Sequence, residues 1–557
     1  MYRSILLGCI VVLFSTARLV SAQPAKATSV MEADKGCQPC HQQMFDKYLN
    51  TYMAKASGSA GDLLHVGQLH HLSSEIEYSV DSEHDGPHLH YHANRASFGL
   101  DAKVAGSEKL DYFLGSGHLG TTYLYSKNGY LFESPIAYYN KIQGYAMKPG
   151  FEASSHIPSG LFLNDGCLRC HMSAVRKPDP GTENHFSSLA FLHTGITCES
   201  CHGDTAQHVS SGGKSPVVNP VKLSPIKRDS TCIVCHLEGD VSVERAGKSV
   251  LNYRPGEDIR DYVAYFSYAS ETNTRRAVSE IEQFTISRCK LVSGDRMSCM
   301  SCHDVHSPPS DTERATFYRA KCLSCHTGEQ FAVQHHPEDH DCTHCHMPKT
   351  GATNVAHVAW TDHRIRRVPE PSYQFNAQPK PGTELIPLLE KGSDTRDLGL
   401  AYYELVVQRD TSRKAIATSL LSGLTNSSSQ PDIPALRALG VLAEMNGRKP
   451  DAERLYREVL KSDPNDLTAN TNLGTLLAQR GDLLGAELQW KDLFNRNEDQ
   501  VLLGRNLAVV QCLLGEGDIA KKTLETALIY SPDDPGALRT LQSILNGEQK
   551  CSVAASK

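Results

Sequence analysis

Seven pentapeptides of the form Cys-x-x-Cys-His lie between residues 37 and 346 of the chain. They are CQPCH (37–41), CLRCH (167–171), CESCH (198–202), CIVCH (232–236), CMSCH (299–303), CLSCH (322–326) and CTHCH (342–346). Fourteen of the 18 cysteines belong to them. Chance does not place seven such matches in one chain, so these cysteines serve a shared chemistry.

Each pentapeptide has the residue types and the spacing that attach a c-type haem. Two thiols three residues apart can add to the two vinyl groups of one haem, and the adjacent histidine then binds the iron. Structural zinc is the alternative, but it takes Cys pairs in twos to make four ligands, and seven pairs do not divide by two. The sequence therefore predicts seven covalently bound c-type haems.

The predicted haem-binding residues follow directly from the pentapeptides. The thioether cysteines are Cys37, Cys40, Cys167, Cys170, Cys198, Cys201, Cys232, Cys235, Cys299, Cys302, Cys322, Cys325, Cys342 and Cys345. The proximal iron ligands are His41, His171, His202, His236, His303, His326 and His346.

The remaining histidines are candidates for the opposite side of each iron. Nineteen of the 26 histidines lie outside the pentapeptides, and none follows His363. Any one of them could instead be a surface or hydrogen-bonded histidine. As a set, their confinement to the part of the chain with the pentapeptides favours two histidine ligands on most irons. Such haems have low reduction potentials, relay electrons and have no open coordination position for a substrate.

A lone Cys289-Lys290 pair precedes the fifth pentapeptide in the stretch TISRCKLVSGDRMSCMSCHDVH. A lysine-ligated catalytic haem would need Cys-x-x-Cys-Lys, but Ile286 stands where the first cysteine would be. The stretch therefore predicts a loop that leads into an ordinary relay haem, and no residue is assigned a catalytic role.

The N-terminus resembles an export signal. Arg3 precedes an apolar run from residue 5 to residue 14, and Val20-Ser-Ala22 has the small residues of a cleavage site. We expect a signal peptide over residues 1–22 and a mature protein in the periplasm. An uncleaved anchor and a lipoprotein signal at Cys9 are the alternatives. The mature chain has no other apolar segment that predicts a membrane helix.

Two regions of different composition follow the signal. Residues 23–375 are rich in Gly, Pro, Ser and His, which predicts a haem-packed domain of short helices and loops with little regular structure. A small β-hairpin region is expected between residues 97 and 139, with its turn at Asn128-Gly129. Residues 376–393 have the Pro and Gly content of a linker.

The C-terminal region repeats every 34 residues. Gly440, Gly474 and Ala508 align, as do Tyr456, Trp490 and Leu524. This period is that of the tetratricopeptide repeat, in which paired helices stack into an α-solenoid with a face for a peptide or a partner protein. We expect the repeats over residues 394–547 and a tail over 548–557, so the fold class is mainly α. The alternative is a generic helical bundle.

These motifs resemble the exported multihaem c-type cytochromes, a group that includes hydroxylamine oxidoreductase and pentahaem nitrite reductase, and more closely the members fused to tetratricopeptide repeats. The resemblance rests on the stretches GCQPCH with TYM, DYFLGSGH, GITCESCHG, CHDVH and HMP with TDHRI. It implies that a histidine shortly after Cys-His-Gly, or in Cys-His-Asp-x-His, ligates a neighbouring haem. The distal ligands that it implies are His208, His306, His118, His363, His357, His71 and Met53.

The expected function is electron transfer along a chain of haems between redox proteins, with the repeats docking a partner. A formal charge of −7 argues against a nucleic-acid partner. The alternative is an oxidoreductase that acts on a small nitrogen or sulfur species at one haem with an open site. Electron transfer requires only the predicted haems and repeats, so it is the predicted function.

Overall fold

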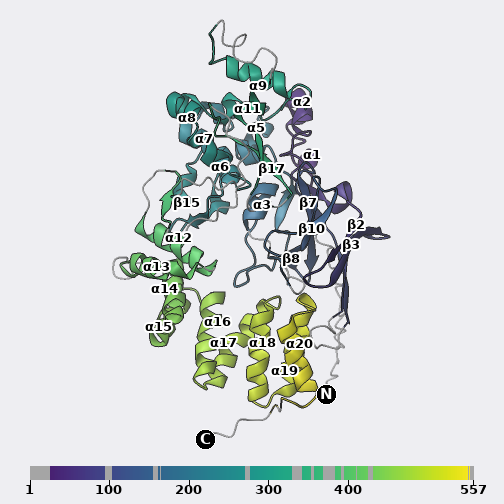
Figure 1. The fold of residues 1–557 in the computed structure, drawn as a ribbon, viewed down its shortest axis with the longest axis vertical. Helices are drawn as coiled ribbons and strands as arrows, with labels where there is room; N and C mark the ends of the chain where they lie inside the picture. The colour runs from purple at the N-terminus through teal and green to yellow at the C-terminus, as the bar shows by residue number, and fades with distance from the viewer. Residues whose placement is uncertain are drawn as a thin grey trace, which may run out of the picture.

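The computed structural model describes residues 26–94, 103–154, 161–162, 165–269, 276–328, 341–352, 355, 357–367, 383–389, 394–408, 410–424, 431–549 and 551. The predicted signal peptide, residues 1–22, lies outside this part of the chain. The N-terminal half combines sheets with short helices, and the C-terminal third consists of stacked helices (Figure 1). Within the described residues, no helix has the length and apolar character needed to cross a membrane.

Four antiparallel strands form the first sheet. They are β2 (Gly67–His71), β3 (Ile76–Glu83), β4 (Gly86–Asn94) and β5 (Lys103–Lys109), in that order. Alternate residues of the two central strands, such as Ile76, Tyr78 and Leu89, are buried in one apolar cluster. Their polar neighbours lie on the opposite face, as the two-residue period of a strand requires.

A seven-stranded sheet packs beside the first. Its strands are β1 (Ser57–Ser59), β6 (Tyr112–Leu114), β7 (Gly120–Lys127), β8 (Tyr130–Glu133), β9 (Ile136–Tyr139), β10 (Gly144–Met147) and β11 (Leu161–Phe162). The β7–β8 hairpin turns at Asn128 and Gly129, whose φ angles of 51° and 85° suit a two-residue turn. The predicted hairpin is confirmed, but the expectation of little regular structure is wrong.

Three small sheets and many short helices complete this half of the chain. The sheets are β12 (Met172–Val175) with β13 (Phe191–Thr194); β14 (Val241–Glu244), β15 (Val263–Tyr268) and β18 (Leu385–Pro387); and β16 (Lys349–Gly351) with β17 (Ala359–Thr361). The helices are α1 (Val30–Ala33), α2 (Gln38–Tyr48), α3 (Asp165–His171), α4 (Glu199–His202), α5 (Ala206–Ser210), α6 (Pro225–His236), α7 (Glu280–Thr285), α8 (Arg288–Ser293), α9 (Arg314–Leu323) and α11 (Cys342–His346). Short 3₁₀ turns are η1 (Ala60–Leu63), η3 (Pro220–Lys222), η4 (Val250–Asn252), η5 (Ile259–Asp261), η6 (Gly294–Arg296), η7 (Cys299–Ser301) and η8 (Thr411–Arg413).

The C-terminal helices repeat with the expected period. They are α12 (Thr395–Val407), α13 (Lys414–Ser422), α14 (Ile433–Met445), α15 (Lys449–Ser462), α16 (Leu467–Gln479), α17 (Leu483–Arg496), α18 (Val501–Leu513), α19 (Gly517–Tyr530) and α20 (Pro535–Leu545). The even-numbered helices from α14 on begin 34 residues apart, as do the odd-numbered helices from α15 on. This register agrees with an α-solenoid of helix pairs.

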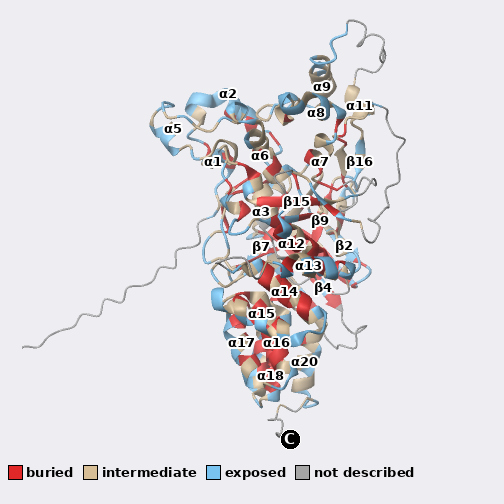
Figure 2. Cartoon of the chain, turned by 90° about the vertical axis from the view of Figure 1, so that its left-hand side faces the viewer, coloured by how far each residue is buried: buried red, intermediate tan, exposed pale blue. Residues whose placement is uncertain are grey.

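The aligned small and large residues explain how the helices of one pair approach each other. A Cβ added at Gly440 would strike the ring of Tyr456, and one added at Gly474 would strike the ring of Trp490. Glycine on the first helix therefore leaves the space that the aromatic ring of the second helix fills. Figure 2 shows buried residues along the stacked helices.

The repeats share a core with the N-terminal half. Phe266 of β15 and Leu400 of α12 belong to one buried cluster that continues through α14 and α16. Part of the predicted linker, Leu385–Pro387, pairs with β15 as strand β18. The carboxylate of Asp397, 1% exposed, binds Arg245 at 2.5 Å across this boundary. The haem-motif region and the repeats are thus packed together rather than merely tethered.

A second contact joins the β7–β8 hairpin to the far repeats. The hydroxyl of Tyr130 donates to the backbone oxygen of Arg496 at 3.0 Å and accepts from the backbone nitrogen of Glu498 at 3.0 Å. The ring of Tyr530 packs against Tyr130 and Phe132. In Figure 1 this contact lies where one end of the stacked helices meets β8.

Candidate functional site

Each described pentapeptide folds as a tight turn or a short helix. In the first, third, fifth and sixth, the backbone N–H of the histidine donates to the carbonyl of the first cysteine at 2.9–3.0 Å. This bond closes one helical turn, so the two thiols and the imidazole come from one compact segment. The turn is formed by local backbone bonds, which is why the pentapeptide can be recognised from sequence alone.

The pentapeptides meet one another in pairs through their cysteine side chains. The contacting pairs are Cys37 with Cys198, Cys170 with Cys235, Cys232 with Cys299, and Cys322 with Cys342. Attachment segments that lie far apart in the chain are therefore neighbours in space. The helices α2, α9 and α11, which carry the first, sixth and seventh pentapeptides, lie toward one end of the long axis (Figure 1).

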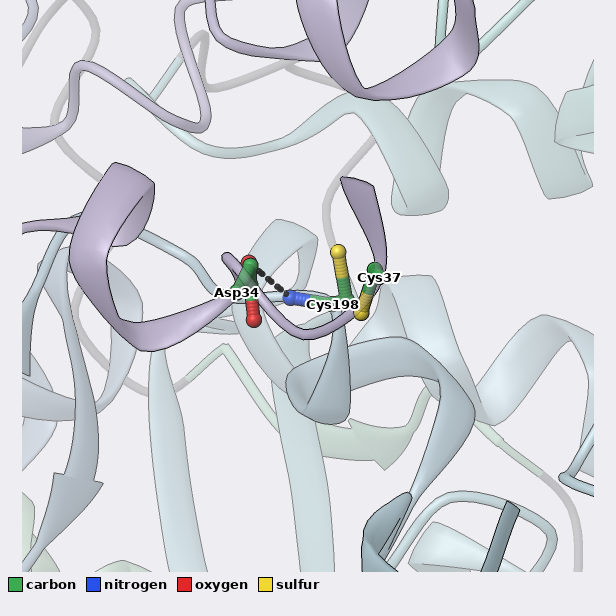
Figure 3. Close-up of side chains that lie close together, drawn as sticks. All are labelled: Asp34, Cys37 and Cys198. Atoms are coloured by element: carbon green, nitrogen blue, oxygen red, sulfur yellow. Dashed lines mark hydrogen bonds between the residues drawn. The ribbon is translucent and has the colours of Figure 1, made fainter. Parts of the chain in front are cut away.

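Asp34 lies beside the first and third pentapeptides (Figure 3). Its carboxylate accepts the backbone N–H of Cys198 at 2.8 Å, and burial raises its pKa. The ligand atoms of Asp34, Cys37 and Cys198 lie within 4.8 Å of one another. Both cysteines are the first thiols of their pentapeptides. No sequence signal marked Asp34.

Three pairs of histidine rings lie close together, with ring planes 15–29° from parallel. The ring centres are 6.3 Å apart for His41 and His208, 6.0 Å for His202 and His306, and 6.2 Å for His303 and His363. Imidazole nitrogens bind transition metals at about 2 Å, so two rings on opposite sides of one iron have centres about 6 Å apart. Each pair joins a histidine of a pentapeptide to one of the implied distal ligands.

Backbone carbonyls fix the protonation of several of these rings. Nδ1 of His202 lies 2.8 Å from the carbonyl of Val218, that of His208 lies 2.7 Å from Ser215, and that of His363 lies 2.9 Å from Thr361. A carbonyl only accepts, so Nδ1 is the N–H donor in each contact, and in a neutral ring with this tautomer Nε2 carries the lone pair. This arrangement presents Nε2 as a metal ligand and holds the ring in place.

Burial favours the neutral form of two of these rings, those of His303 and His306. It lowers the pKa of His303 to about 4, with the nearby His363 and His236 acting in the same direction. Burial, followed by the neighbouring His202, also lowers the pKa of His306. Since only neutral imidazole can bind a metal through its lone pair, both residues favour the ligand form. The paired rings and the thiol turns together fit a covalently attached haem.

Comparisons with known proteins point to the same cofactor chemistry. The family model of cytochrome c554 and c-prime matches residues 147–203, which contain the second and third pentapeptides. The multihaem cytochrome MtrA of Shewanella baltica (strain OS185) is 25% identical over 193 residues, which are 32% of this chain and 55% of that protein. These stretches are similar to multihaem cytochromes. The aligned part spans about half of MtrA.

Solved structures similar to this chain include repeat proteins. MamA (AMB-1, P212121 form) is 19% identical, with a TM-score of 0.25, over 28% of this chain and 82% of that chain. A tetratricopeptide repeat protein from Parabacteroides merdae ATCC 43184 is 17% identical, with a TM-score of 0.23, over 26% of this chain and 59% of that chain. At these TM-scores the likeness carries no argument, and the repeat architecture rests on the 34-residue helix register.

Two further implied ligands of the multihaem type stand beside tyrosines. The ring of His118 stacks on Tyr52 at 4.6 Å, and its Nδ1 lies 3.1 Å from the Tyr52 hydroxyl. Burial, then the charges of Lys349 and Arg314, lower the pKa of His118. His357 is exposed, and its ring lies 5.4 Å from that of Tyr139. Neither faces a pentapeptide histidine in the ring contacts of the described residues.

Two other implied ligands, His71 and Met53, make contacts with other parts of the protein. Nδ1 of His71 lies 2.7 Å from the Ser74 hydroxyl, and Nε2 lies 2.9 Å from the carbonyl of Glu152. Both ring nitrogens therefore have hydrogen-bond partners within the protein, and iron binding by His71 stays a prediction. Met53 packs against the buried cluster that contains Tyr48.

The side chain of Lys290, which follows Cys289, contacts other protein groups. The Lys290 ammonium donates to the carbonyl of Met297 at 2.8 Å and lies 4.0 Å from Asp229. It also lies over the ring of Phe284, at 5.8 Å from the centroid. These contacts hold the Lys290 ammonium within the protein, and the expectation that Lys290 is not an iron ligand stays a prediction.

Proposed function

We propose that this protein is an exported electron carrier that holds seven c-type haems, one on each pentapeptide. The three facing histidine pairs carry the proposal. Their ring spacing is the spacing that two axial imidazoles need, and such ligation leaves no open position for a substrate. The haem, when bound, supplies an iron that changes reversibly between two oxidation states.

The pairs also suggest an order among the haems. Histidines of the first, third and fifth pentapeptides are each faced by one that follows the third, fifth or seventh. We therefore assign His208, His306 and His363 as distal ligands, and each ligand segment ties one haem site to the next. We retain His118 and His357 as candidates for the remaining irons. Such interlocking fits a relay between two redox proteins.

The chain offers support for export and for docking. Cys512 and Cys551 form a disulfide, and disulfides persist in oxidising compartments such as the periplasm. The ends of α17 and α19 contact the β7–β8 hairpin, so one edge of the repeat array is occupied by an intramolecular contact. We propose that their other surfaces bind a partner protein or peptide.

Haem counting and spin-state spectroscopy test the proposal together. Haem per chain is measured by the pyridine haemochrome absorbance, and the added mass by mass spectrometry. We expect seven haems, low-spin ferric signals and no binding of carbon monoxide to most reduced haems. A stoichiometric high-spin haem that binds carbon monoxide or nitrite and turns over would instead support the oxidoreductase.

A further inference from the structure

The tip of the β3–β4 hairpin brings carboxylates and imidazoles together. We name Asp81, Glu83, Asp85, His88 and His90 the hairpin cluster. Asp81 and His88 are directly opposite in the strand register, and Glu83 and His90 lie two residues further along the same face of each strand. Strand geometry therefore holds four of the five side chains on one face of the sheet.

Distances within the hairpin cluster match those among ligands of one metal ion. Nε2 of His90 lies 3.2 Å from Oδ1 of Asp81 and 3.2 Å from Oε1 of Glu83. In a tetrahedral site with bonds of about 2 Å, neighbouring ligand atoms are separated by about 3.3 Å. The three ligand atoms all lie within 4.8 Å of one another.

Charge in the hairpin cluster favours a cation at this point. Lys109 lies 3.0 Å from the Asp85 carboxylate and offsets that charge. Asp81 and Glu83 instead both face one nitrogen of His90, which can offer at most one proton to two carboxylates. A divalent ion would balance both carboxylates and use all three groups as ligands.

His88 lies in the same hairpin cluster, beside Glu83 and Asp85. It is 7% exposed, and its Nδ1 lies 3.0 Å from the carbonyl of Gly86, so Nδ1 carries the proton. Its Nε2 has no hydrogen bond among the described residues and points toward Asp85 at 3.6 Å. The largely buried imidazole thus lies between two carboxylates of the hairpin cluster, those of Glu83 and Asp85.

The hairpin cluster is separate from the proposed haem sites. None of its members belongs to a pentapeptide, and in Figure 1 strand β3 lies at the side of the molecule, away from α2, α9 and α11. Imidazole combined with carboxylate suits zinc and its neighbours in the transition series, whereas calcium and magnesium prefer oxygen ligands alone.

We propose that the hairpin cluster binds one divalent transition-metal ion of the zinc class, with His90, Asp81 and Glu83 as its protein ligands. His88 steadies the site through Glu83, whose second oxygen lies 3.8 Å from the His88 ring. The ion would pin the ends of β3 and β4 to each other. This inference does not depend on the proposed electron-carrier function.

Zinc titration of the haem-loaded full chain tests the site. We expect one Zn²⁺ per chain by calorimetry and by elemental analysis after gel filtration. His90→Ala and Asp81→Asn should each weaken binding by about tenfold or more. The control is His92→Ala, an exposed histidine on the same face of β4 but outside the cluster, which should bind zinc within about twofold of wild type.

Several results would overturn the proposal. They are the absence of stoichiometric zinc, equal losses in His92→Ala and His90→Ala, or displacement of zinc by equimolar calcium. Haem absorbance and the circular dichroism of each variant report whether it has folded. Because Asp81→Asn preserves side-chain size, it keeps the test decisive if His90→Ala does not fold.

Discussion

The imidazole rings of His41 and His208 face each other with centres 6.3 Å apart and planes 18° from parallel. His41 belongs to the first pentapeptide, whereas His208 lies on α5, just after the third. The Nδ1 of His208 is held by the carbonyl of Ser215 at 2.7 Å, so its Nε2 is the available ligand atom. Two distant segments thus supply the two sides of one proposed iron site.

Replacing His208 by alanine should open that site. The His208→Ala variant is expected to show one new high-spin haem per chain and to bind one carbon monoxide after reduction, because the iron loses one axial nitrogen. Electron paramagnetic resonance and absorbance titration measure both changes. The exposed His84→Ala is the control and should show neither change. A fully low-spin His208→Ala protein would refute this ligand assignment.

The buried ion pair between the two halves should contribute strongly to stability. Asp397 is 1% exposed and bonds both Arg245 and Arg396, at 2.5 and 2.7 Å. Asp397→Asn removes the carboxylate charge beside Arg245 and leaves Arg396 with Asp432 alone, so it should lower the free energy of unfolding by about 3 kcal/mol. Urea denaturation followed by haem absorbance and by helix signal checks this value.

The control for this pair is Asp410→Asn, which breaks a more exposed pair with Arg413. It should cost less than about 1 kcal/mol. Equal losses of unfolding free energy in Asp397→Asn and Asp410→Asn would show that the boundary ion pair stabilises the protein no more than the exposed pair does. Because the core is continuous across this boundary, loss of Asp397 should shift both signals together.

The Cys512–Cys551 disulfide closes a loop with a sequence separation of 39. Cys551→Ser should lower the stability of the last repeats by about 3–4 kcal/mol, because the unfolded chain regains the freedom that the bond removes. Thermal melting of the far-ultraviolet helix signal measures the loss, and a reducing agent should destabilise wild type but not the variant. Cys289→Ser, a free and half-buried thiol, should leave the melt unchanged.

Asp499 should make the contact between the repeats and the β7–β8 hairpin pH-dependent. Burial raises its pKa to about 7, with Glu183 and Glu498 adding to the shift. Neither carboxylate oxygen has a hydrogen-bond partner within the described chain. The folded state therefore keeps a proton that the unfolded state loses above pH 4, so stability falls as pH rises from about 4 to 7.

Asp499→Asn should remove this dependence. We expect the variant to match wild type at or below about pH 4 and to exceed it at pH 8 by on the order of 2–4 kcal/mol, as measured by urea midpoints. Asp492→Asn, on the exposed side of α17, is the control and should keep the wild-type profile. An unchanged pH profile in Asp499→Asn would show that this carboxyl is ionised in the folded protein.

Local signals predicted much of this architecture. The 34-residue period is visible because each helix pair needs a small residue opposite a large one, as Gly440 stands opposite Tyr456. The Asn128-Gly129 turn is likewise set by its own backbone angles. Each of these features is decided by residues close together in sequence.

The β2–β5 sheet was missed for a physical reason. In β4, His88, His90 and His92 alternate with Leu89 and Tyr91, and this alternation is the two-residue period of a strand. The histidines were interpreted as iron ligands or as surface or hydrogen-bonded residues, although their spacing also indicated a strand.

Contacts between distant segments could not be predicted from local pattern. Tyr130 bonds Arg496 and Glu498, more than 360 residues away, and nothing near Tyr130 in sequence indicates that partner. The disulfide of Cys512 with Cys551 likewise depends on how the tail folds back onto α18. The facing histidines were implied by family resemblance, and their pairing emerges only from the fold.

Paramagnetic resonance of the oxidised triple variant His208→Ala/His306→Ala/His363→Ala is the most direct test of the bis-histidine relay. The account predicts that three haems per chain change from low spin to high spin, and that the reduced protein binds three carbon monoxide molecules, while the haemochrome count stays at the wild-type value. An unchanged low-spin spectrum with a full haem count would contradict it.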